Sequence, residues 1–184
     1  MTPKVSRRLV IDASIARSSG EGRPPAQACR AFLADVLDIC HRLVLASPAR
    51  CEWKKHRSRF ASTWGVSMEA RKKTDRPEVS PDHRLRREIR RLPLPQRTVA
   101  AMLKDAHLIE AALSADGLIV SLDEEARKGF ARASQSIPRI EGIVWVNPER
   151  DCNVRDWLRS GAPRDEERTL QALARRLNDS TQEA

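Results

Sequence analysis

The sequence lacks the features that mark membrane and secreted proteins. No stretch reaches the roughly 18 consecutive apolar residues that a membrane span needs. Residues 1–20 contain no long apolar run, so we expect no secretory signal peptide. Internal repeats and low-complexity tracts are also absent. These absences favour a cytoplasmic globular protein with no membrane partner.

Cysteine is scarce and is not spaced for metal binding. None of the four cysteines forms a CxxC pair, and no histidine stands at zinc-ligand spacing from two of them. We therefore predict no zinc site and a reducing, cytoplasmic environment. Cys29 and Cys40 fall in a predicted helix and are expected to act as small core residues.

Acidic residues are outnumbered by basic ones. The chain has 25 Asp and Glu against 34 Lys and Arg, a net charge of +9, and an isoelectric point near 10.1. This excess favours an anionic partner, most commonly nucleic acid. A merely soluble, arginine-rich protein would show the same excess, so charge alone leaves both interpretations open.

Short continuous apolar runs predict a buried sheet. Each run lacks the polar alternation of a half-exposed strand, which is typical of parallel strands covered on both faces. Helical patterns separate the runs, so the order predicts a three-layer α/β/α fold with a mostly parallel sheet. The four runs are residues 8–11, 43–46, 118–122 and 142–146.

At 184 residues the chain suits one domain with an appendage. We assign residues 1–148 to the α/β domain and residues 149–184 to a C-terminal helical extension. Within the domain, the basic, proline-rich residues 72–95 are expected to form an exposed connection with one helical turn. The extension carries an amphipathic helix, predicted from helical spacing of Leu170, Leu173, Ala174 and Leu177.

Acidic residues follow two of the predicted strands. Asp12 comes directly after the first strand, and Asp123 directly after residues 118–122. Because parallel strands share their carboxyl ends at one edge, these carboxylates are expected to meet there. Glu52 lies in the helix after the second strand and can face the same cleft. Asp105 interrupts the apolar stripe of another helix, where an unpaired carboxylate would be costly.

Each acid also has a purely structural explanation. Asp12 would cap a helix or turn, and Asp123 and Glu125 would be favourable charges in the first turn of a helix. Glu52 would pair with Lys55 or His56 on a surface. Asp105 would be the buried partner of an arginine.

Four carboxylates in one cleft would repel one another and raise one another's pKa values. Divalent cations would neutralise that charge, and hard oxygen ligands select Mg²⁺ or Mn²⁺. Two such ions about 4 Å apart are a common means of activating water against a phosphodiester. An acidic cleft in a basic protein therefore predicts a nuclease.

Two other phosphate-handling classes are excluded by missing residues. A haloacid-dehalogenase phosphatase needs a second aspartate two residues after the first, where this chain has Ser14. No GxxxxGK[ST] motif occurs, which excludes a P-loop NTPase.

Four segments resemble, in order, the signatures of the PIN-domain family of metal-dependent nucleases. They are LVIDASIA, SPARCEW, KDAHLIEAAL and LIVSLDEEAR, and the resemblance spans residues 8–146. It implies about five parallel strands flanked by helices, and a Mg²⁺- or Mn²⁺-dependent endoribonuclease that cleaves RNA, which we expect to be single-stranded. Many members are toxins held by an antitoxin protein, and many are homodimers. A non-catalytic RNA-binding module that keeps the PIN fold is the alternative.

The resemblance also implies roles for individual residues. Asp12, Glu52, Asp105 and Asp123 would be the catalytic, metal-ligating acids, and Glu125 would act on a second metal through water. Ser14 and Ser121 would help to orient the site. Residues 72–95 and the segment after Pro148 are long for the compact toxin members.

Basic residues near the first and second segments are candidates for RNA binding. Arg17 lies just after the first acid, and Lys54, Lys55, Arg57 and Arg59 follow the second segment. Their contacts with phosphates would make binding salt-dependent. Trp53 and Trp64 lie close by and would either stack on bases or pack in the core. A second basic group lies at residues 84–91. His107 is expected to point away from Asp105 and not to act as a general base.

Overall fold

The computed structural model describes residues 5–20 and 24–182. A five-stranded, all-parallel sheet lies at its centre, in the order β3-β2-β1-β4-β5. The strands are β1 (Arg8–Ile11), β2 (Arg42–Val44), β3 (Thr74–Asp75), β4 (Leu118–Val120) and β5 (Val144–Val146). This architecture confirms the predicted α/β class and the mostly parallel sheet.

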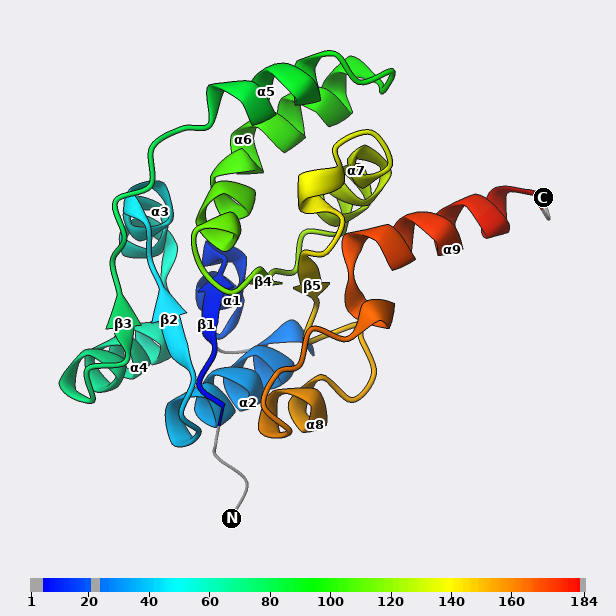
Figure 1. Cartoon of the computed structure of the whole chain (residues 1–184). Helices are drawn as coiled ribbons and strands as arrows, with labels where there is room; N and C mark the ends of the chain where they lie inside the picture. The colour runs from blue at the N-terminus through cyan, green and yellow to red at the C-terminus, as the bar shows by residue number, and fades with distance from the viewer. Residues whose placement is uncertain (1–4, 21–23, 183–184) are drawn as a thin grey trace.

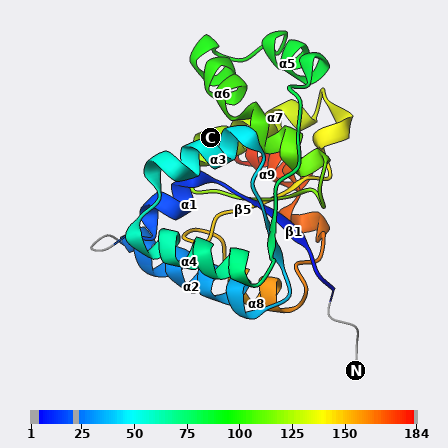
Figure 2. The ribbon, with the colours of Figure 1, turned by 90° about the vertical axis from the view of Figure 1, so that its left-hand side faces the viewer.

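Helices cover both faces of the sheet (Figures 1 and 2). On one face lie α1 (Ala13–Ser18), α2 (Pro24–Asp38), α3 (Ser47–His56), α4 (Arg59–Ala70) and α8 (Val154–Arg159). On the other lie α5 (His83–Arg90), α6 (Gln96–Leu113), α7 (Glu124–Ser134) and α9 (Leu170–Gln182). Short 3₁₀ turns occupy Pro138–Ile140 and Glu166–Arg168. The three layers predicted from the strand–helix order are therefore present.

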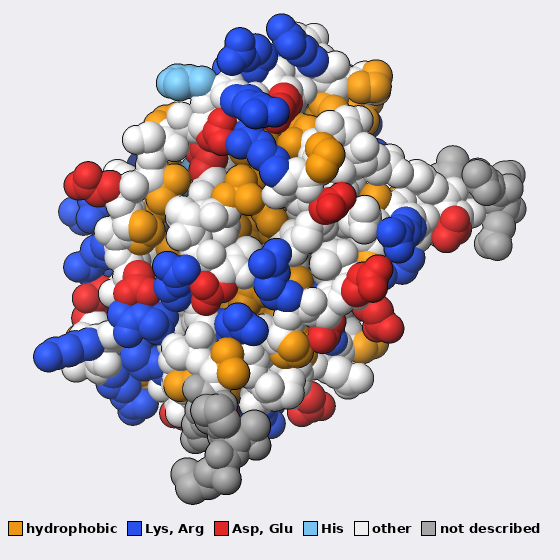
Figure 3. Space-filling model, viewed as in Figure 1, with side chains coloured by type: hydrophobic (Ala, Val, Ile, Leu, Met, Phe, Trp, Pro, Cys, Tyr) orange, Lys and Arg blue, Asp and Glu red, His pale blue; other side chains and the backbone are white. Residues whose placement is uncertain are grey.

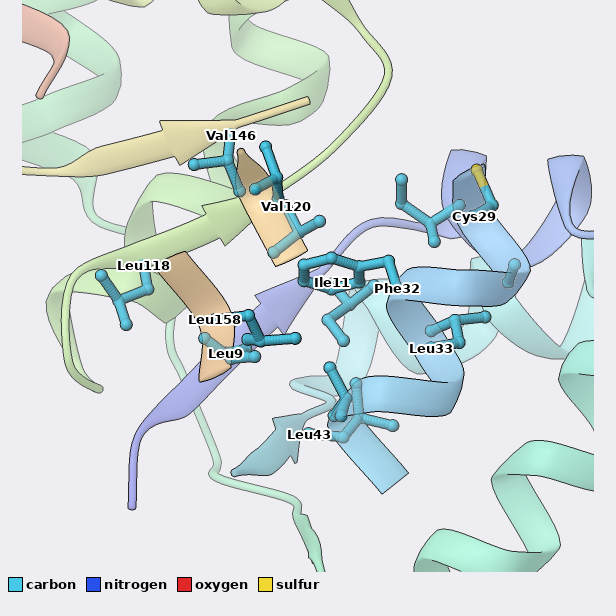
Figure 4. Packing of buried hydrophobic residues seen from close by; sticks show 14 of the residues in the cluster. Leu9, Ile11, Cys29, Phe32, Leu33, Leu43, Leu118, Val120, Val146 and Leu158 are labelled. Atoms are coloured by element: carbon cyan, nitrogen blue, oxygen red, sulfur yellow. The ribbon is translucent and has the colours of Figure 1, made fainter. Parts of the chain in front are cut away.

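The strands divide their side chains between two cores. Leu9 and Ile11 of β1 pack against α2 on one face, while Val10 between them packs against α6 and its neighbours on the other. Figure 4 shows the first core, in which Phe32 of α2 lies beside Ile11 of β1. Because both faces of the central strands are buried, the residues that follow Arg8 in β1 and Arg42 in β2, and all of β4 and β5, are apolar, and the period-two pattern is hidden in the sequence.

Residues 72–95 are more ordered than an exposed connection. β3 forms at the sheet edge, where Leu43 N–H donates to Lys73 O at 2.8 Å and Leu45 N–H to Asp75 O at 2.9 Å. Asp82 caps α5 by accepting from Leu85 N–H at 2.8 Å, and α5 buries Leu85 completely. The expected single helical turn is an eight-residue helix. The edge strand was missed because its two polar residues carry no strand pattern.

The C-terminal segment packs onto the same sheet. α8 covers α2, and α9 lies against α7, where Leu170 and Ala174 are buried in the second core. Leu170 N–H also donates to Ile143 O at 2.9 Å, next to β5. The predicted C-terminal helix is thus present as α9, and its last turns project from the body in Figure 1. None of the described helices is long and apolar enough to cross a bilayer.

The structure shows how far the predicted core cysteines and the two tryptophans near the second segment are buried. Cys29 is a fully buried core residue, and burial raises the pKa of its thiol to about 11. Cys40 follows the end of α2 and is only partly buried, so its placement within a helix was wrong. Trp53 and Trp64 are 4 % and 3 % exposed, with ring centroids 5.8 Å apart, so both are core residues rather than stacking platforms.

Candidate active site

One pocket lies where β1 and β4 end. Its volume is about 300 Å³, and it is open to the surface. All four predicted acids line it, each from a different segment of the chain: Asp12, Glu52, Asp105 and Asp123. The other lining residues are Ala13, Ser14, Arg17, Ser18, His56, Lys104 and Leu122. We call this hollow the acid pocket.

Hydrogen bonds at the strand ends position Asp12. Its N–H donates to Val120 O at 2.9 Å and so extends the pairing of β1 with β4. Ser14 Oγ and Ser121 Oγ both donate to Asp12 Oδ2, at 2.5 and 2.8 Å. Asp12 precedes α1 but makes no side-chain capping bond, so the capping explanation for this residue was wrong. The two serines instead fix one carboxylate oxygen, Oδ2.

Asp123 has two roles. Its Oδ1 accepts from Ala126 N–H at 2.9 Å, so it caps α7 from just before the first turn, where the structural explanation had placed its charge. Its own N–H donates to Ser121 Oγ at 3.1 Å, which links it to the residue that also holds Asp12. Capping and lining of the acid pocket are therefore compatible in one side chain.

Glu52 is placed by its neighbour in the sequence. Trp53 Nε1–H donates to Ile11 O at 2.7 Å and ties α3 to the end of β1. This contact brings Glu52 to the pocket that Asp12 lines, although the two residues lie 40 positions apart. No bond joins Glu52 to Lys55. Across the packing of α3 on α6, His107 Nε2 lies 3.6 Å from Glu52 Oε2.

His107 is a residue that the sequence did not reveal as part of the site. It is 5 % exposed, and its ring Nδ1 donates to Lys104 O at 3.0 Å, because a carbonyl oxygen can only accept. Its Nε2 is buried without a hydrogen bond and faces Glu52. Only the packing of α3 on α6 creates this contact, and no sequence pattern announces it.

Asp105 has no arginine partner among the described residues, so that structural explanation was wrong. It is partly buried, and burial raises its pKa to about 6. Lys104 opposes the shift, while the negative charges of Asp123 and Asp12 add to it. The carboxylates of Asp12 and Asp123 therefore repel that of Asp105 across the pocket. No ion pair with a described residue compensates the charge of Asp105.

The acids are near neighbours without forming a tight cluster. Within the described ranges, no three His, Cys, Asp or Glu side chains stand close enough together to hold a metal ion as they are placed. Glu125 does not line the acid pocket. It lies at the start of α7 and lines a separate hollow with Arg97, Thr98 and Ala101 of α6.

Basic side chains surround the pocket. Arg17, Lys104 and His56 line it directly, and the sequence had singled out only the first of these for binding. The other predicted RNA-binding residues, Lys54, Lys55, Arg57 and Arg59, are exposed on α3 and at the start of α4. In the second basic group, Arg86 is occupied by an ion pair with Glu110 at 2.8 Å. Figure 3 shows that Lys and Arg side chains gather on the surface over α5.

No protein-family model matches the chain, and no curated protein matches it. What the protein does has therefore to be inferred from the acid pocket and its surroundings.

Proposed function

We propose that the protein is a divalent-metal-dependent endoribonuclease. The observation that carries this proposal is the convergence of Asp12, Glu52, Asp105 and Asp123 on one pocket at the carboxyl edge of a parallel sheet. Four segments that are far apart in the sequence contribute one carboxylate each. A set of surface acids with only structural roles has no reason to converge in this way.

The donor set fits a hard cation. The pocket offers carboxylate and hydroxyl oxygens and no thiol, which suits Mg²⁺ or Mn²⁺. Asp105 has the uncompensated charge that such an ion would neutralise. When bound, the ion would act as a Lewis acid toward a phosphodiester and lower the pKa of water. Asp12, Glu52, Asp105 and Asp123 would hold it, and Glu125, two residues after Asp123, would act on a second ion through water.

The remaining residues of the pocket have roles of their own. Ser14 and Ser121 hold Asp12 Oδ2, so that the carboxylate keeps one orientation. Arg17 and Lys104 stand at the pocket where they would bind the phosphates of RNA. Their positive charge would attract the polyanion to an otherwise acidic hollow and position the bond to be cleaved.

The four segments that resemble the PIN family supply exactly these acids, and the five-stranded parallel sheet agrees with that resemblance. We therefore propose a PIN-type ribonuclease, with an antitoxin-like inhibitor and a homodimer as predicted partners. The four cysteines are free, which suits the reducing cytoplasm that we propose as its location.

A non-catalytic RNA-binding module is the second candidate. The looseness of the acid cluster in the described residues favours it, because a catalytic centre is expected to be preorganised. Mutual repulsion among carboxylates would also keep such a cluster open before a cation enters. Cleavage of RNA distinguishes the two candidates.

The test is cleavage of a labelled single-stranded RNA by the purified protein in Mg²⁺, in Mn²⁺ and in EDTA. We expect cleavage only with metal, and a loss of at least about a thousandfold in Asp123→Asn. Asparagine is as good a helix cap as aspartate, so α7 should be kept. Asp156→Asn removes an exposed charge on α8 and is the matched control, which should cleave normally. Metal-independent binding without cleavage by the wild type would establish the second candidate.

A further inference from the structure

A second hollow lies between the end of α1 and the helices α2 and α4. Its volume is about 570 Å³, within the usual range of ligand sites. Its walls are Gly20, Arg30, Arg59, Phe60 and Thr63, and we call it the Phe60 hollow. Arg30 and Phe60 also line a further, mainly apolar hollow along α2, which continues the same depression.

Arg30 is held in place within the Phe60 hollow. Its Nε donates to Ser19 O at 2.7 Å, and its guanidinium carbon lies 5.6 Å from the centroid of the Phe60 ring. Ser19 is itself buried and shares a 2.8 Å hydrogen bond with Ser58, at the start of α4. The guanidinium therefore presents a fixed, planar, positively charged surface beside an aromatic ring.

The two arginines of the Phe60 hollow have no acidic partner in the part of the chain that the structure describes. Neither Arg30 nor Arg59 forms an ion pair with any residue in the described ranges, and none of the described residues that line this hollow or its continuation along α2 is an acid. Arg59 is exposed. Two arginines next to an aromatic ring and apolar walls are complementary to a nucleotide, which has an anionic phosphate and a flat base.

The two hollows are joined through a short piece of chain. Arg17 and Ser18 line the acid pocket, and Gly20 lines the Phe60 hollow. The backbone is close to α4 here, because a Cβ on Gly20 would lie 3.4 Å from Ser58 Cβ. A polymer bound at the acid pocket would therefore reach the Phe60 hollow by passing over the end of α1.

We propose that the Phe60 hollow binds a nucleotide of single-stranded RNA that flanks the position of cleavage. Arg59 would contact its phosphate, and the base would stack against Arg30 and Phe60. The inference rests on the proposed function, because it assigns the acid pocket to the same RNA strand. The Phe60 hollow would favour single-stranded RNA, because a base that is paired within an A-form duplex is not free to enter it.

The experiment is RNA binding by fluorescence anisotropy in EDTA, where cleavage does not occur. One labelled RNA of about ten nucleotides spans both hollows, and one of about three nucleotides fills only the acid pocket. Arg59→Ala removes the phosphate contact. Phe60→Leu removes the ring and keeps the packing that Phe60 makes with the first core. Arg175→Ala, on the exposed side of α9, removes an equal charge far from both hollows and is the control.

We expect Arg59→Ala and Phe60→Leu each to weaken binding of the longer RNA about five- to tenfold, without affecting the shorter one. Arg59→Ala should also lower the salt dependence of binding by about one phosphate contact. Equal affinities of these variants and Arg175→Ala for the longer RNA would overturn the proposal. Far-UV circular dichroism checks that each variant is folded. If the two variants bind the longer RNA more weakly but the wild type cleaves no RNA, the Phe60 hollow remains an RNA-binding site and only the nuclease proposal is refuted.

Discussion

Two aspartates, in helices on opposite faces of the sheet, are both withdrawn from solvent, but their pKa values shift in opposite directions. Asp35 of α2 is 6 % exposed and accepts hydrogen bonds from Arg155 and Arg159 of α8, at 2.6 and 2.8 Å. Burial alone would raise its pKa, but the two arginines outweigh burial and lower it. Asp105 of α6 is partly buried, has no ion pair in the described part of the chain, and has a pKa raised to about 6.

The difference is not caused by a shortage of basic residues. The chain has 34 Lys and Arg, and the fold brings two of them to Asp35 from about 120 positions away along the chain. Asp105 instead faces other carboxylates. A buried acid whose charge is left uncompensated beside Asp12 and Asp123 destabilises the free protein and is typical of functional sites. Asp35 holds the fold together, and we infer that Asp105 serves the chemistry.

The largest effect on stability is expected at Asp35. Asp35→Asn should lower the free energy of unfolding by about 2 kcal/mol at neutral pH, because charged hydrogen bonds to both arginines are lost. The lowered pKa of Asp35 means that its contribution is present above the ordinary value of 3.8 and is lost as pH falls through the folded-state value. Urea unfolding at about pH 7 and pH 3 measures this. A cost at pH 3 as large as at pH 7 would contradict the assignment.

Asp105→Asn should act in the opposite direction. In EDTA it should raise the free energy of unfolding by about 1 kcal/mol above pH 6, because ionising Asp105 costs free energy in the folded protein. A raised pKa means that this cost grows as pH rises from 3.8 to about 6, so the gain should vanish at lower pH. Urea unfolding in EDTA at about pH 8 and pH 4 tests it. Destabilisation by this variant at pH 8 would remove the contrast with Asp35.

How much of this could be predicted from the sequence differs between elements. Continuous apolar runs identified β1, β2, β4 and β5 to within a few residues, since both faces of the sheet are covered. β3 has two polar residues at an edge and is held by backbone bonds to β2, which leave no mark on composition. The helix at residues 83–90 was underestimated because its many arginines hide Leu85 and Ile89.

In the candidate site, too, some residues could be predicted from local sequence patterns and others could not. Asp12, Asp105 and Asp123 could be placed because strand ends and an interrupted apolar stripe are local patterns. The contact of His107 with Glu52, and the position of Glu125 in a separate hollow, depend on how α3, α6 and α7 pack together. No local pattern encodes those packings. The burial of Trp53 and Trp64 is also decided by tertiary contacts, since each indole N–H donates to a backbone carbonyl.

The most direct test of the central claim is thermal unfolding of the protein at neutral pH as Mn²⁺ is added. A cation that binds the four acids of the folded chain should raise the melting temperature as its concentration rises. At a hundredfold excess over its dissociation constant, binding should add about 2.7 kcal/mol to the free energy of unfolding. Asp105→Asn should show a much smaller rise, and Asp156→Asn the full one. A wild-type melting temperature that does not respond to Mn²⁺, or equal rises in all three proteins, would contradict a metal site at the acid pocket.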